Sequence, residues 1–175
     1  YDGVARANEV IQIVGSPDVK DMTDAEKAQV VAEARFLRAH YHFEAKKMWG
    51  KVPYIDDKIY KASDPNSTKI PNTEDIWLKI EADLEFAGNT LPAVQAQKGR
   101  ATKWAAKAYL AKAKIFQKKW GEAKALLEDV YKNSGKKLVA NYHDNYRTVT
   151  NNNSESIFEV QFSVNDGTTG NNGNA

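Results

Sequence analysis

The stretch Asp24–Trp49, DAEKAQVVAEARFLRAHYHFEAKKMW, is the longest uninterrupted helical pattern in the chain, and the other elements are placed around it. Thr23 or Asp24 can cap its N-terminus, and Gly50 followed by Pro53 ends it. Neither glycine nor proline falls inside the stretch. The sequence therefore predicts one long α-helix around which the fold is organised.

This predicted helix has two apolar stripes when its residues are projected at about 100° per residue. The first stripe consists of Val30, Ala34, Leu37, Tyr41, Ala45 and Met48. The second, roughly opposite, consists of Ala32, Phe36, Ala39 and Phe43. One polar flank between them holds Arg35, Arg38, His42 and Lys46, and the other holds Glu26, Glu33, His40, Glu44 and Lys47. Because a two-helix hairpin needs only one apolar stripe, we expect neighbours on both sides, as in a stacked helical array.

Further helices are predicted over residues 1–14, 73–91, about 102–118 and 122–131, each from apolar residues at helical spacing. The last two helices, with a tight turn at Lys118–Gly121 and Ala123 three residues after Trp120, resemble a tetratricopeptide (TPR) unit. An ordinary packed helical hairpin would use the same residues. We expect residues 1–135 to form a TPR-like helical array with a long loop at 50–72.

The C-terminal part changes character after Gly135. Residues 157–164 alternate apolar and polar side chains, which predicts a half-buried strand whose partner is Lys137–Val139 or lies outside this chain. Residues 136–164 then form a loop and a strand, and 165–175 are a polar Gly/Asn segment. The predicted fold is mainly α, with stacked αα-hairpins of TPR-like type and a short C-terminal β-strand. Both ends look cut from something larger, so we expect the chain to be a piece of a longer protein.

Composition excludes several classes of function. The net charge of +2 is too small, and its Lys and Arg residues too evenly interleaved with Asp and Glu, to indicate nucleic-acid binding. The absence of cysteine excludes disulfides, thiolate nucleophiles and cysteine-type zinc sites. No run of about 18 apolar residues occurs, so the sequence predicts no membrane-spanning helix.

No residue pattern predicts catalysis, a metal site or a cofactor. Asp56 and Asp57 are adjacent in a loop, so their carboxylates point to opposite sides, whereas a glycosidase needs two carboxyls facing each other across the substrate. These residues are the only motive for a third functional hypothesis, an α-helical glycosidase, which is weaker than the two hypotheses given below. His40 and His42 are two residues apart on a helix and cannot chelate one metal as an i, i+4 pair does. We expect no enzyme activity.

The residues from Ala32 to Pro53 resemble the signature helix and loop of the SusD/RagB family of surface glycan-binding lipoproteins. The most specific part is Glu33–Pro53, which includes ARFLRA in the helix and WGKVP after it. The remaining pieces follow in the order of that family: Ala5–Asn8, Ile80–Leu84, Leu91–Pro92, the TPR-like pair and Asn153–Val160. The resemblance therefore covers almost the whole chain.

This resemblance implies a non-enzymatic protein of polysaccharide utilisation at the cell surface. Such a protein is anchored to the outer membrane by a lipid, which is absent from this chain, captures oligosaccharides and acts as a lid on a SusC-type TonB-dependent transporter. Family members are several times longer than this chain. The alternative hypothesis is a free-standing TPR-type adaptor that holds a peptide in a helical groove, motivated by the charge-segregated flanks of the long helix.

Sugar binding requires flat aromatic rings that stack on pyranose faces beside amide and carboxylate groups. Tyr54 and Tyr60 lie in the polar loop near Asp56, Asp57, Asn66 and Ser67, and they are our candidate sugar-binding residues. Core packing is the expected role of Trp77, Trp104 and Trp120, whereas Trp49 is expected to pack under the loop. We therefore expect residues 1–175 alone to bind oligosaccharides weakly or not at all.

Overall fold

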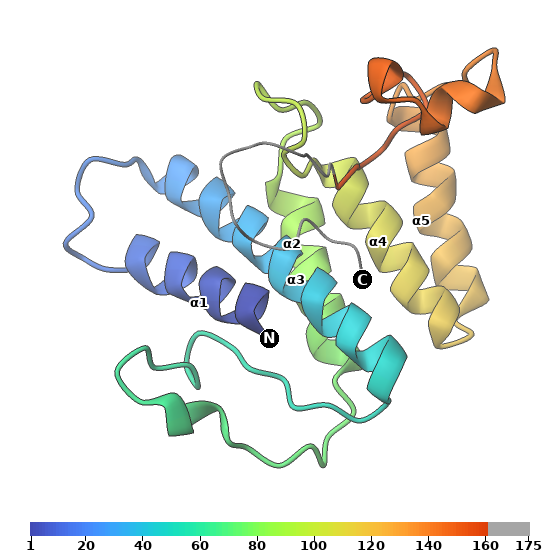
Figure 1. Ribbon diagram of the computed structural model, residues 1–175. Helices are drawn as coiled ribbons and strands as arrows, with labels where there is room; N and C mark the ends of the chain where they lie inside the picture. The colour runs from blue at the N-terminus through green and yellow to red at the C-terminus, as the bar shows by residue number, and fades with distance from the viewer. Residues whose placement is uncertain (161–175) are drawn as a thin grey trace.

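A computed structural model of the chain describes residues 1–160. Its five α-helices are α1 (Asp2–Val14), α2 (Asp24–Trp49), α3 (Trp77–Thr90), α4 (Lys103–Phe116) and α5 (Trp120–Asn133). Short 3-10 helices are η1 (Pro65–Thr68), η2 (Tyr142–Tyr146) and η3 (Thr148–Thr150). Each α-helix packs against the next one along the chain, so the five form one stacked array (Figure 1). The predicted mainly helical fold is confirmed.

The predicted long helix matches α2 at both ends. Thr23 and Glu26 form a reciprocal capping box, in which the Glu26 N–H donates to Thr23 Oγ1 at 3.3 Å and the Thr23 N–H donates to Glu26 at 2.8 Å. Gly50 closes the helix with a φ of 72°, a conformation that glycine adopts without strain. Helices α1 and α3 lie on either side of α2, so the expectation of two neighbours is confirmed (Figure 1).

The hydrophobic core forms around the second apolar stripe of α2. All four residues of this stripe are fully buried, and they pack with Ile80, Leu84 and Ala87 of α3 and with Ala105, Ala106 and Ala113 of α4. The alanines allow close approach of the helix axes. The first stripe is buried only at Ala34 and Ala45, whereas Leu37, Tyr41 and Met48 are exposed. The two stripes therefore differ, and only the second belongs to the main core.

Some sequence-based boundaries and burial predictions were wrong. Helix α3 begins at Trp77 rather than Thr73, and the Asp75 carboxylate accepts a hydrogen bond from the Trp77 N–H at 3.2 Å. Trp120 is the first residue of α5, and the tight turn lies just before it with Lys118 at a φ of 62°. The Trp120 side chain is 62% exposed, contrary to the prediction of core packing. Trp49 is also exposed. Trp104 is buried, as predicted.

The C-terminal part of the array contains no strand among residues 1–160. Residues 157–160 have no regular structure, and 161–164 of the predicted strand and the polar segment 165–175 lie outside the described residues. The Lys137 N–H donates to the Ser154 carbonyl at 3.0 Å, so the proposed partner segment pairs just ahead of the predicted strand. Phe158 packs against Phe36 of α2, with ring centroids 5.0 Å apart, and so holds residues 157–160 against the array.

Candidate functional site

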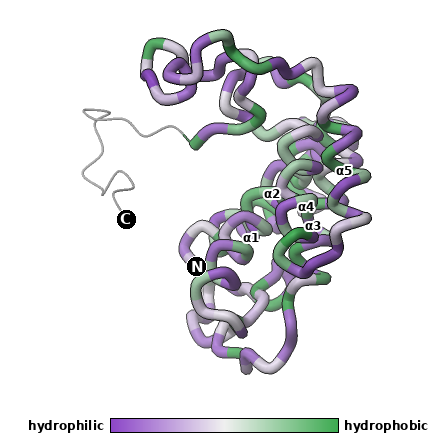
Figure 2. The backbone as a smooth tube through the Cα atoms, turned by 90° about the vertical axis from the view of Figure 1, so that its right-hand side faces the viewer, coloured by the Kyte–Doolittle hydropathy of each residue, from purple (hydrophilic) through white to green (hydrophobic). Residues whose placement is uncertain are grey.

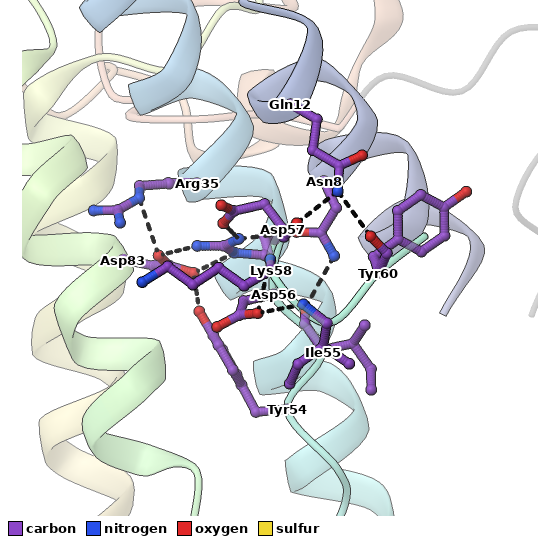
Figure 3. A network of polar contacts seen from close by, with 12 residues as sticks. Asn8, Gln12, Arg35, Tyr54, Ile55, Asp56, Asp57, Lys58, Tyr60 and Asp83 are labelled. Atoms are coloured by element: carbon purple, nitrogen blue, oxygen red, sulfur yellow. Dashed lines mark hydrogen bonds and ion pairs between the residues drawn. The ribbon is translucent and has the colours of Figure 1, made fainter. Parts of the chain in front are cut away.

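Two residues on one polar flank of α2 are buried, which sequence analysis did not predict. Arg38 has only 2% of its surface exposed, and His42 has none. Arg38 donates to Asn8 from α1 and to Asp83 from α3, and His42 stacks on Tyr54 from the loop after α2. Figure 3 shows Asn8, Tyr54 and Asp83 converging from these elements. Three helices and the loop thus share one buried polar network.

Arg38 is the centre of this network. Its Nε and Nη2 atoms donate to the two carboxylate oxygens of Asp83 at 2.8 and 2.7 Å, a bidentate pair. Its Nη1 atom donates to Asn8 Oδ1 at 2.8 Å and to Asp57 Oδ1 at 2.7 Å. Burial alone lowers the pKa of Arg38, but the hydrogen bonds and charge of Asp83 outweigh it and raise the pKa above its usual value. The guanidinium therefore stays charged although it is buried.

His42 and Tyr54 extend the network toward the loop. The Tyr54 hydroxyl donates to Asp83 at 2.5 Å, and its ring stacks on the His42 ring with centroids 4.4 Å apart. His42 Nε2 accepts from the Ile55 N–H at 3.0 Å, so its Nδ1 carries the proton and donates to the Arg38 carbonyl at 3.0 Å. Burial lowers the pKa of His42 to about 4, which keeps the ring neutral at pH 7.

Further hydrogen bonds from α1 hold the loop in place. Asn8 Nδ2 donates to the Ile55 carbonyl at 3.1 Å. Gln12 Nε2 donates to the carbonyls of Asp57 at 2.5 Å and Tyr60 at 2.7 Å. The Tyr60 hydroxyl donates to Glu9 at 2.6 Å, and this bond raises the pKa of Tyr60. Residues 54–60 are therefore fixed to three helices, and within residues 1–160 no buried side-chain nitrogen or oxygen lacks a partner.

The two candidate sugar-binding tyrosines do not share one exposed surface. Tyr54 is 6% exposed, and its ring and hydroxyl are both occupied by His42 and Asp83. Tyr60 is half-buried and lines a cavity of about 380 Å³ together with Tyr1, Asp2, Val4, Ala5, Pro53, Ile55 and Thr68. The burial of Tyr54 leaves Tyr60 as the candidate of the pair that can meet a ligand, and its role stays a prediction.

The acidic and histidine residues singled out from the sequence have structural partners. Asp56 Oδ1 accepts from the N–H groups of Lys58 and Ile59 at 3.0 Å each, and Asp57 pairs with Arg38. His40 Nδ1 lies 2.6 Å from the hydroxyl of Tyr109. In the part of the chain that is described, no group of three His, Asp or Glu residues is arranged to hold a metal ion, and no helix is both long and apolar enough to cross a membrane.

Comparison with known proteins identifies the family to which this helical array belongs. The family model described as "Starch-binding associating with outer membrane" matches residues 1–115. The chain belongs to the SusD-like family. This confirms the resemblance drawn from the ARFLRA helix and the WGKVP loop, and the family comprises glycan-binding proteins rather than enzymes.

Individual SusD-like proteins are similar over most of the chain. A SusD-like protein of Bacteroides ovatus is 35% identical over 173 residues, covering 93% of this chain and 31% of the relative. A laminarin-binding SusD-like protein superimposes with a TM-score of 0.75 at 31% sequence identity, and the match covers 90% of this chain and 35% of that protein. A third relative is surface glycan-binding protein A from Bacteroides thetaiotaomicron, solved in complex with laminarihexaose. It superimposes with a TM-score of 0.76 at 27% sequence identity, and the match covers 93% of this chain and 34% of that protein. This chain thus spans about a third of the length of these relatives.

Proposed function

We propose that this chain is the helical part of a surface protein that captures oligosaccharides for uptake. The observation that carries the proposal is its likeness, over 93% of the chain, to a surface glycan-binding protein solved with laminarihexaose. The laminarin-binding SusD-like protein points to the same class of ligand. A glucose oligosaccharide is therefore the first ligand to try.

The same proposal includes a place in the cell. The family is described as associating with the outer membrane, and a lipid outside this chain would supply the anchor. A SusC-type TonB-dependent transporter would receive the captured oligosaccharide. The array of α1–α5, in which the loop is pinned by the Arg38 network, suits a rigid scaffold with a transporter-facing surface.

The experiment for glycan capture is affinity electrophoresis of the full-length gene product in gels that contain laminarin or starch. Retarded migration relative to a gel without polysaccharide is the expected result. Unchanged migration across a broad panel of polysaccharides would refute glycan capture. Transfer of the oligosaccharide to the transporter is tested separately, by co-purification in mild detergent of the full-length protein with the transporter encoded by the neighbouring gene. Failure to co-purify would refute that part of the proposal.

The alternative hypothesis, a peptide-binding adaptor, has less support than glycan capture. The motive for it is the charge-segregated flanks of the long helix, although stacked helices usually solvate or pair such flanks. Arg38 and His42 on one flank are instead buried and fully engaged within the chain. These two residues therefore cannot present a polar surface to a peptide.

A further inference from the structure

Residues 136–156 form an excursion that projects from the α5 end of the array (Figure 1; upper end of Figure 2). Its turns are held by polar side chains. Thr150 Oγ1 donates to the Asp144 carbonyl at 2.5 Å and to the Arg147 carbonyl at 3.0 Å. Asn153 Nδ2 donates to the same Asp144 carbonyl at 3.3 Å and to Asn145 Oδ1 at 3.0 Å. These bonds fix the backbone of η2 and η3 although none of their residues is buried.

Two tyrosines stand on the outside of this fixed turn. Tyr142 is 67% exposed and Tyr146 is 71% exposed, and both belong to η2. Their ring centroids are 5.3 Å apart with an interplanar angle of 63°, and their hydroxyl oxygens are 2.7 Å apart. The rings are therefore oriented by each other and by a fixed backbone, and within residues 1–160 both remain largely exposed.

The turn that carries the two rings also carries polar side chains of the kinds that bind sugar hydroxyls. Asn141, His143 and Asn151 are exposed in the same segment, and the Asn141 Oδ1 already accepts from the His143 N–H at 3.1 Å. Apart from His143, the charged side chains between residues 141 and 153 are Asp144 and Arg147, and these lie 3.6 Å apart as an ion pair. Glu155, whose negative charge acts on Tyr146, is in none of the ion pairs of residues 1–160. The local charge therefore disfavours an acidic ligand, and a neutral one fits best.

We propose that Tyr142 and Tyr146 form a contact site for a neutral oligosaccharide, an inference that rests on the proposed function. Aromatic rings bind the apolar C–H faces of pyranose units, and amides bind the hydroxyls between them. A turn that is already ordered loses little conformational freedom when it binds, so two rings suffice for a measurable contribution. The site adds one subsite and does not replace a larger binding arc elsewhere in the full-length protein.

The test is calorimetry on the full-length protein with laminarihexaose, comparing wild type with Tyr142→Ala, Tyr146→Ala and the double variant. We expect each single variant to bind about 3-fold more weakly and the double variant about 10-fold more weakly, in the range of one or two aromatic contacts. Tyr131→Ala is the matched control, because Tyr131 is 84% exposed but lies on α5 outside the turn. The control should bind like wild type, and Tyr142→Phe with Tyr146→Phe should retain most of the affinity.

Melting temperature separates a binding role from a packing role. Because both rings are exposed, the double alanine variant should melt within a degree or two of the Tyr131→Ala control. Wild-type affinity in the double variant would overturn the inference. So would a clearly lower melting temperature, since another part of the protein would then cover the rings. If wild type itself binds no member of a glycan panel, the proposed function fails and this inference falls with it.

Discussion

At the scale of single residues, Arg38 depends on Asp83 to remain charged inside the protein. A buried ion pair is a weak source of net stability, but removal of one partner leaves the other charge without compensation. Asp83 is buried and receives three hydrogen bonds, two from Arg38 and one from Tyr54. Its carboxylate would retain only the Tyr54 bond and the longer contact with Arg35 if Arg38 were removed.

The first prediction compares two arginines that face this carboxylate. Arg38→Met should lower the free energy of unfolding by about 3–5 kcal/mol, because it leaves Asp83 buried without its bidentate partner. Arg35→Met is the matched control: Arg35 Nε lies 3.5 Å from Asp83, and the side chain is one-third exposed. This change should lower stability by about 1 kcal/mol or less. Urea denaturation measures both, and equal losses would contradict the central place of Arg38.

The second prediction concerns pH and His42. Its pKa of about 4 in the folded protein lies below the ordinary 6.5, so the unfolded chain binds the proton more readily. Stability is therefore full above about pH 6.5 and falls as the pH drops toward 4, by at most about 3 kcal/mol. His42→Gln should be less stable at pH 7 and should lose less stability than wild type between pH 6.5 and 4. Parallel pH profiles for the two proteins would show that His42 is not the titrating group.

Sequence reasoning failed at these residues for a physical reason. A helical projection places Arg38 and His42 on a polar flank, and a polar flank normally faces water. Their burial depends on Asp83, which lies 45 residues further along the chain, and on a loop that folds back onto the same flank. For Tyr54 the same limit applies, because its polar neighbours in sequence did not indicate that its ring stacks on His42.

At the scale of elements, the sequence predicted the ends of a helix correctly where the residues that form those ends are neighbours in the chain. The capping box of Thr23 and Glu26 and the terminal Gly50 lie within α2 or next to it, and both ends of that helix were predicted correctly. The start of α3 was placed too early because Thr73 and Asp75 both fit a helix N-terminus. Trp120 was predicted to pack in the core from its helical core or turn spacing, but it is 62% exposed in residues 1–160.

The third prediction concerns the ionic cluster that joins the last three helices. Glu81 of α3 is buried and accepts hydrogen bonds from Lys114 at 2.6 Å and Lys119 at 2.8 Å. These cations, together with Gln117, hold the pKa of Glu81 below its usual value even though burial alone would raise it. Glu81→Gln should therefore cost about 2 kcal/mol or more, because Lys114 is buried too.

Hydrogen exchange locates that effect. In the Glu81→Gln variant, amides of α4 and α5 should exchange faster, while those of α1 stay as protected as in wild type. Glu85→Gln, one turn later on α3 and exposed, is the matched control and should change neither stability nor exchange. Uniformly faster exchange over all five helices would argue against a local clamp.

At the scale of the whole molecule, the order of helices was predictable and the C-terminal part was not. Periodicity identifies each helix from its own residues, and the ARFLRA and WGKVP pieces identified the family. Residues 136–160 are arranged by pairs such as Lys137 with Ser154 and Phe158 with Phe36, which no local pattern reveals. For the same reason the exposed pair of Tyr142 and Tyr146 was not selected, although two tyrosines four residues apart in an Asn-rich stretch were a visible signal.

The account as a whole is tested most directly by calorimetry with laminarihexaose on two samples, the full-length gene product and residues 1–175 alone. Glycan sites join several rings and polar groups in one concave surface. Among the described residues, our candidate sugar contacts are the Tyr142 and Tyr146 pair and the half-buried Tyr60, and they amount to less than such a surface. We predict saturable binding by the full-length protein and binding by residues 1–175 that is at least about tenfold weaker or not detected. Absence of binding by the full-length protein, for laminarihexaose and for a panel of other oligosaccharides, would contradict the assignment to glycan capture.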